Sequence, residues 1–231
     1  MKVYAIRFVG QAMPNSNGTI RRPRVQDLKL PCNLHDGPVL EAFANGDLIS
    51  LESLRILSTV FCPQNISHLE RLIQTPSLQV LRVTGLQPGD LGLRDPLSLG
   101  DIHTFVLQIN WYPDDSHLSV VRWWTRCLAI SHSLQKVTIL YDTRPPFSNP
   151  HTPDTNDEDS ARLAWMNLDR VFSEKTPFTL RGFRMMLCTN LFRKEDRLEL
   201  KEGMEEMFPG IQARCKLRVD VVKDFRSVIP R

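Results

Sequence analysis

A short apolar pattern, spaced apolar-x-x-apolar-x-apolar, recurs along the chain and limits its possible folds more than any other feature. The seven copies are Val3/Ile6/Phe8, Val25/Leu28/Leu30, Leu51/Leu54/Ile56, Leu78/Leu81/Val83, Ile102/Phe105/Leu107, Leu134/Val137/Ile139 and Leu180/Phe183/Met185. Four of the six intervals between copies are 22 to 27 residues long. Leucine-rich repeats have this period, and each repeat supplies one strand and a helical return. Inserted segments explain the two longer intervals.

The segments between these copies have helical spacing. We expect helices at 67–73, 117–130, 159–174 and 195–207, and a last strand at 217–221. Strands that alternate with helices predict a parallel sheet. The predicted fold class is therefore α/β, an irregular leucine-rich-repeat-like solenoid with helices on its convex side, in a single domain over residues 1–231. The asparagine that closes a regular repeat is missing, so a doubly wound open sheet is the alternative.

One segment, residues 142–160, differs in composition from the rest. It holds four prolines and five acidic residues against the lone Arg144. Such a segment buries too little apolar surface to offset the entropy cost of ordering it. We expect a disordered acidic loop there.

Composition limits the possible partners and compartments. The formal net charge is only +3, which is smaller than bulk nucleic-acid binders usually carry. Five widely spaced cysteines without a CxxC pair favour reduced thiols, and hence an intracellular protein, cytoplasmic or nuclear. No stretch approaches the roughly 18 apolar residues of a membrane helix, so we expect no membrane partner.

Groups that could carry chemistry are isolated from one another. Three cysteines have a histidine nearby: Cys32 with His35, Cys62 with His68, and Cys127 with His132. None of these pairs is followed by a second pair at the spacing of a zinc site. The Asp114-Asp115 pair is typical of a solvated turn, and neither a phosphate loop nor a nucleophile elbow is present. We expect no catalytic residue, metal site or cofactor, and therefore no enzyme.

The second half of the chain resembles a known family. The residues that carry the resemblance are Trp123-Trp124 before the strand at 134–139, Trp165 to Asp169 before Phe178 to Phe183, and Met207 to Ile211 before Leu217 to Val219. Together they resemble the C-terminal, leucine-rich-repeat-like region of fungal F-box proteins, over residues 50–222. The resemblance implies a repeat domain that selects the substrate of a ubiquitin ligase.

In that family an N-terminal F-box docks on the ligase scaffold. An F-box opens with a Leu-Pro signature in a helical segment, whereas the one such pair here, Leu30-Pro31, is followed by Cys32-Asn33. Residues 1–30 have the pattern of strands. We therefore expect the docking module to be absent, and the ligase role is not carried over.

In each copy of the pattern, the last two apolar residues should face the core and the residue between them the opposite side of the sheet. Five of these seven intervening residues are basic, and the other two are Val106 and Thr138. The predicted partner-binding residues are Arg7, Lys29, Arg55, Arg82 and Arg184. Neighbouring parallel strands lie about 4.8 Å apart, so these side chains would form a ladder.

The ladder allows two interpretations. Long basic side chains can simply keep an exposed sheet face soluble, with Asp27 and the acidic loop as internal counter-charges. Alternatively, the ladder binds an acidic or phosphorylated segment of a partner, because the arginine fork suits carboxylate and phosphate.

The leading functional hypothesis is a non-enzymatic protein-interaction module, similar to the substrate-recognition part of an F-box protein. A nucleic-acid-binding protein is an alternative, because residues 1–36 carry six basic and two acidic residues. Stacking aromatics, which usually accompany single-strand recognition, are not interleaved with them. A degenerate fragment with no retained activity is the third hypothesis.

Overall fold

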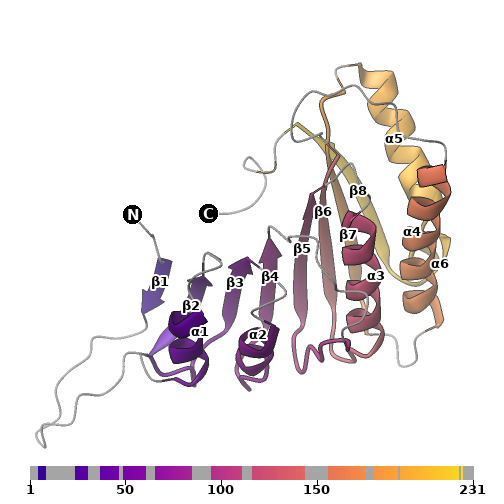
Figure 1. Ribbon diagram of the computed structural model, residues 1–231. Coiled ribbons are helices and arrows are strands. Elements are labelled where there is room, and N and C mark those ends of the chain that lie inside the picture. The colour runs from indigo at the N-terminus through magenta and orange to yellow at the C-terminus, as the bar shows by residue number, and fades with distance from the viewer. Residues whose placement is uncertain are drawn as a thin grey trace, which may run out of the picture.

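Eight strands form one sheet in chain order, from β1 to β8, and helices lie between most of them (Figure 1). The computed structural model describes residues 5–8, 24–30, 37–46, 49–60, 66–84, 95–110, 116–143, 156–174, 179–191, 193–223 and 225. The strands are β1 (Ala5–Phe8), β2 (Val25–Leu30), β3 (Ile56–Val60), β4 (Val80–Thr84), β5 (Thr104–Asn110), β6 (Lys136–Asp142), β7 (Gly182–Cys188) and β8 (Lys216–Val222). The helices are α1 (Gly37–Ala44), α2 (Ile66–Ile73), α3 (Ser116–Ala129), α4 (Asn156–Glu174), α5 (Lys194–Glu206) and α6 (Pro209–Arg214).

The sheet is parallel from β2 to β8, with each strand paired to the next in sequence. This confirms the predicted α/β class with a parallel sheet. A doubly wound sheet reverses its strand order at a switch point, and the described strands contain no such reversal. The first strand departs from the prediction, because β1 pairs with β2 antiparallel, with an irregular register between Arg7 and Phe8.

The core lies between one face of the sheet and the helices. Alternate residues of each strand point to this face, so period-two burial recurs, as in β5, where Phe105, Leu107 and Ile109 are buried. Figure 1 shows α1, α2 and α3 in front of the sheet, and their buried residues belong to the same apolar cluster as those of the strands. Helices α4, α5 and α6 contribute to that cluster too. The other face, called here the open face, carries the half-buried and exposed residues of each strand.

The repeated apolar pattern correctly marks the core in five of its copies. Every residue is buried in the copies that start at Val25, Leu78, Ile102, Leu134 and Leu180. The copy that starts at Val3 includes residues outside those described. The copy at Leu51/Leu54/Ile56 is wrong, and its correction affects the candidate site below.

The predicted helices are present, and two more were missed. Helices α2, α3, α4 and α5 overlap the four predicted ranges, and β8 covers the predicted last strand. Helix α4 starts at Asn156, so the end of the expected disordered segment is helical, and Asp142 belongs to β6. Residues 144–155 of that segment lie outside the described residues. Helices α1 and α6 were not predicted. Helix α1 begins with a Gly-Pro pair, which is typical of a turn, and α6 is a six-residue turn that begins at a proline.

The adjacent tryptophans of α3 are both buried. Trp123 is 0% and Trp124 is 1% exposed, and the ring centroids of Trp124 and Phe105 on β5 are 4.8 Å apart. Trp123 donates a hydrogen bond from Nε1 to the Asp95 carbonyl at 3.3 Å. These aromatic rings fill the layer between α3 and the sheet and are part of the core.

Candidate interaction surface

The open face carries rows of side chains that run across the strands. The central row, as defined by strand register, consists of Lys29, Ser58, Arg82, Val106, Thr138, Arg184 and Arg218. The first row lies two residues earlier on each strand and consists of Asp27, Ile56, Val80, Thr104, Lys136, Gly182 and Lys216. Residues two apart on a strand share a face, so both rows line the open face.

Three of the five predicted binding residues lie in the central row: Lys29, Arg82 and Arg184. Arg7 lies on the antiparallel strand β1, opposite Asp27 and therefore outside the central row. Arg55 precedes β3, and Ser58 takes its place between Lys29 and Arg82. The predicted continuous ladder is thus two separate basic groups, one on β2 and β4 and the other on β7 and β8.

The misplacement of Arg55 has a specific cause. The buried residues are Leu54, just before β3, and Leu57 and Thr59 on the strand, whereas Ile56 is only partly buried. The third core position holds threonine, so a search for three apolar residues finds Leu51/Leu54/Ile56 instead and shifts the register. Arg55 therefore lies before the strand, where it is exposed and belongs to neither row of the open face.

Asp220 on β8 neutralises part of the second basic group. Arg184 donates from Nε to Asp220 Oδ2 at 2.7 Å, and Arg218 donates from Nε to Asp220 Oδ1 at 2.9 Å. Partial burial opposes ionisation of Asp220, but the hydrogen bonds and charges of the two arginines outweigh it, so the pKa of the carboxyl lies below its usual value. Sequence reasoning missed both Asp220 and Arg218, although their alternation with Leu217, Val219 and Val221 would have revealed them.

Lysines flank a glycine at the start of the last three strands. In the first row, Gly182 lies between Lys136 on β6 and Lys216 on β8, and both lysines are exposed. They escaped sequence reasoning because only the central residue of each repeat was considered. The sequence pattern that predicts them is a basic residue two positions before the central intervening residue of a repeat.

The carboxyl ends of β6 and β7 are covered on the open face. Phe225, which is 5% exposed, forms a small apolar cluster with Leu140, Met186 and Cys188. Cys188 also donates from Sγ to the Lys223 carbonyl at 3.2 Å. Lys223 and Phe225 therefore lie against the sheet here. The cluster also reaches the central row, where the partly buried Val106 packs against it, so among the described residues the first row is the part of the open face farthest from this cover.

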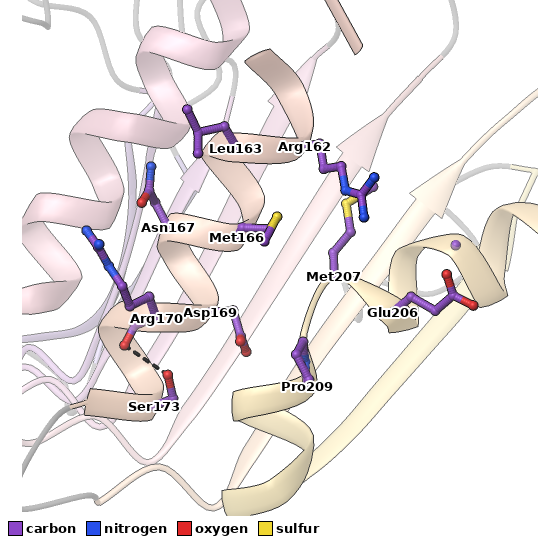
Figure 2. A pocket seen from close by; sticks show the side chains of 11 residues that line it. Arg162, Leu163, Met166, Asn167, Asp169, Arg170, Ser173, Glu206, Met207 and Pro209 are labelled. Atoms are coloured by element: carbon purple, nitrogen blue, oxygen red, sulfur yellow. Dashed lines mark hydrogen bonds between the residues drawn. The ribbon is translucent and has the colours of Figure 1, made fainter. Parts of the chain in front are cut away.

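A groove with a volume of about 620 Å³ lies on the helical side, between α4 and the segment that joins α5 to α6 (Figure 2). One wall is formed by α4, including the exposed side chains of Leu163 and Met166. The opposite wall carries Glu206, Met207 and Pro209. No acid–base pair or nucleophile with an adjacent base is apparent among its lining residues.

The carboxylate in this groove already has partners. Asp169 Oδ1 accepts a hydrogen bond from the Ile211 amide at 2.7 Å, and Oδ2 accepts one from the Gly210 amide at 3.0 Å. Asp169 thus caps the amino end of α6 from a distant helix. The nearby rings of Trp165 and Phe208 have centroids 6.3 Å apart. Two of the segments that carried the family resemblance, Trp165 to Asp169 and Met207 to Ile211, therefore contact each other in a structural role.

Other reactive groups are buried or dispersed. Cys127 accepts a hydrogen bond from the Leu97 amide at 3.2 Å, and burial raises the pKa of its thiol to about 12. No cluster of three or more potential metal-ligating side chains occurs within the described part of the chain. Among the same residues, no helix has the length and apolar character needed to cross a membrane. Cys32, Cys62, Asp114-Asp115 and the basic Arg21-Arg22 pair lie outside the described residues.

Comparisons with known proteins found no matching family model, curated protein or solved structure.

Proposed function

We propose that this chain is a non-enzymatic protein-interaction module, a leucine-rich-repeat-like solenoid that presents the open face of its sheet to a partner protein. In this proposal the chain acts as the substrate-recognition region does in the F-box proteins that its sequence resembles. The proposal is supported by strands that follow one another in chain order with their helices on one face.

One observation carries the proposal. Lys29 and Arg82 lie two strands apart in the central row, on a sheet face that the described helices leave uncovered. Ser58 separates them, so their backbones are about 10 Å apart. Neither forms an ion pair with a described residue, in contrast to Arg184. An exposed lysine and a half-buried arginine at this spacing suit an acidic segment that crosses the strands.

The test is a quantitative capture experiment with a matched charge control. The immobilised chain is incubated with nuclease-treated cell extract, and bound proteins are quantified by mass spectrometry. We expect Lys29→Glu with Arg82→Glu to lower the recovery of specific partners about tenfold, because rim charges govern encounter and affinity. Arg55→Glu reverses the same kind of charge off the open face and should leave capture unchanged.

Three results would contradict the proposal. Capture by the double variant at the parental level, with its thermal midpoint unchanged, would remove the open face as the binding surface. Binding that occurs in untreated extract but not in the nuclease-treated extract would favour the nucleic-acid hypothesis, with a steep salt dependence as its second sign. Absence of any saturable capture by the parent chain would favour a fragment without retained activity.

A further inference from the structure

Gly182 occupies a strand position at which the fold does not require glycine. Its φ is not positive, since only Gly46 and Gly100 have positive φ among the described glycines. A Cβ atom added at Gly182 would meet only the Lys216 carbonyl, at an ordinary contact distance of 3.9 Å. The register of β7 with β6 and with β8 is continuous, so no bulge lies there. Gly182 is the first residue of β7, and a glycine in a strand leaves the backbone open to close approach by a ligand or by another backbone.

The side chains around Gly182 are almost all cationic. Lys136 on β6 and Lys216 on β8 flank it in the first row. In the central row, Arg184 lies two residues after Gly182 on β7, and Arg218 lies two residues after Lys216 on β8. Asp220 is their counter-ion, so four positive charges face one negative charge. The two strand spacings between the lysines amount to about 10 Å. The absent side chain of Gly182 leaves a notch between them, here called the Gly182 notch.

Asp220 also positions the two arginines. It accepts a hydrogen bond from Nε of Arg184 and of Arg218, and neither guanidinium has another polar contact with a described residue. The terminal nitrogens of both therefore remain available to a second anion. Thr138, beside Arg184 in the central row, adds a hydroxyl that can donate a hydrogen bond.

From this geometry we infer that the Gly182 notch binds a phosphate group. A phosphate carries about 1.5 to 2 negative charges at neutral pH and accepts several hydrogen bonds. It matches the local excess of positive charge better than a single carboxylate does. Arginine forks and lysine ammonium groups are the common protein ligands of phosphate.

The phosphate belongs to a phosphorylated protein segment, and this part of the inference rests on the proposed function. Neither the first row nor the central row contains an aromatic side chain on which nucleic-acid bases could stack. The notch adjoins the same open face that carries Lys29 and Arg82. A peptide that crosses the strands can therefore contact both basic groups.

The first test measures the phosphate site alone, with pyrophosphate as the probe. Titration of the full chain, followed by amide NMR, should shift the Gly182 signal saturably. Gly182→Ile fills the notch without changing any charge and suits a β-strand, so it should weaken binding at least tenfold. Lys136→Ala with Lys216→Ala should have a similar effect. Arg122→Ala removes an exposed charge on α3 and should leave binding unchanged.

The second test identifies the source of the phosphate. Two degenerate nine-residue peptide pools, one with a central phosphoserine and one with serine, are titrated against the parent chain and Gly182→Ile. We expect the phosphorylated pool to bind the parent at least tenfold more tightly than the serine pool, and Gly182→Ile to abolish that difference. Equal binding of both pools, or tighter binding of pyrophosphate than of the phosphorylated pool, overturns the peptide assignment.

The site itself is overturned if Gly182→Ile, with an unchanged thermal midpoint, binds pyrophosphate as the parent does. Tighter binding of a single-stranded oligonucleotide than of the phosphorylated pool, sensitive to the same variant, assigns the notch to nucleic acid and contradicts the inference. Failure of the proposed function is distinguishable from these results. If the proposed function is wrong, partner capture does not depend on Lys29 and Arg82, whereas pyrophosphate still shifts the Gly182 signal.

Discussion

Arg184 and Asp220, on neighbouring parallel strands, form the shortest ion pair of the open face among the described residues, with Nε and Oδ2 2.7 Å apart. Arg218 binds the same carboxylate. Two like charges on adjacent strands repel each other, and the shared acid offsets that repulsion. The cluster therefore combines a structural role with a residual positive charge.

Replacing the shared acid should weaken the fold in a pH-dependent way. Asp220→Asn should lower the free energy of unfolding by about 1 kcal/mol at pH 7, because two charge-assisted hydrogen bonds lose their anion. The folded pKa of Asp220 is depressed, so its contribution is present above the unfolded pKa, near 3.9, and fades as the pH falls through the lower folded value. Urea unfolding of parent and variant between pH 7 and pH 2.5 measures this. A difference that grows with acidification would contradict the assignment.

A glycine substitution should test the docking of α6 on α4. A Cβ at Gly210 would lie 2.5 Å from the Ser173 Cβ, so Gly210→Ala should cost about 2 kcal/mol in the free energy of unfolding. Gly203→Ala on α5 is the matched control, since no atom lies within 4 Å of its added Cβ. It should stabilise by up to about 1 kcal/mol, because alanine favours a helix interior. Equal effects of the two substitutions in urea titrations would exclude the close approach.

The thiol of Cys127 should be unreactive in the folded protein. Its raised pKa of about 12 leaves almost no thiolate at pH 8, and its side chain is fully buried. We expect iodoacetamide to label Cys215, which is partly exposed, well before Cys127, with both labelled rapidly in urea. Peptide mass spectrometry over time gives the two rates. Labelling of Cys127 at the rate of Cys215 without denaturant would contradict its burial.

Phe225 should stabilise the sheet beyond the last strand. Phe225→Ala removes a ring that is 5% exposed from the small cluster with Leu140 and Met186. The expected loss in the free energy of unfolding is about 3 kcal/mol, as for other buried phenylalanines. Leu198→Ala on α5 is the control, because that leucine is 50% exposed and its loss should cost little. Similar thermal midpoints for both variants would show that Phe225 does not hold the open face.

The sequence by itself determined the parallel sheet and most of its core. Buried strand residues recur with a fixed spacing because side chains alternate between the two faces, and that periodicity is visible without coordinates. In five copies of the pattern, from Val25 to Leu180, every residue is buried as expected. Local spacing also predicted the helices α2 to α5, because their apolar residues recur with the helical period.

Only the tertiary structure decided which charges meet. The threonine at position 59 hid the third core position of its repeat, so the predicted frame was three residues early and gave Arg55 the place that Ser58 occupies. The direction of β1 removed Arg7 from the row, and strand pairing placed Asp220 between Arg184 and Arg218. The notch at Gly182 likewise exists only through the register of three strands far apart in the chain. The local apolar pattern indicates which face of the sheet each side chain is on. Contacts between side chains of different strands depend on strand register, which only the assembled sheet determines.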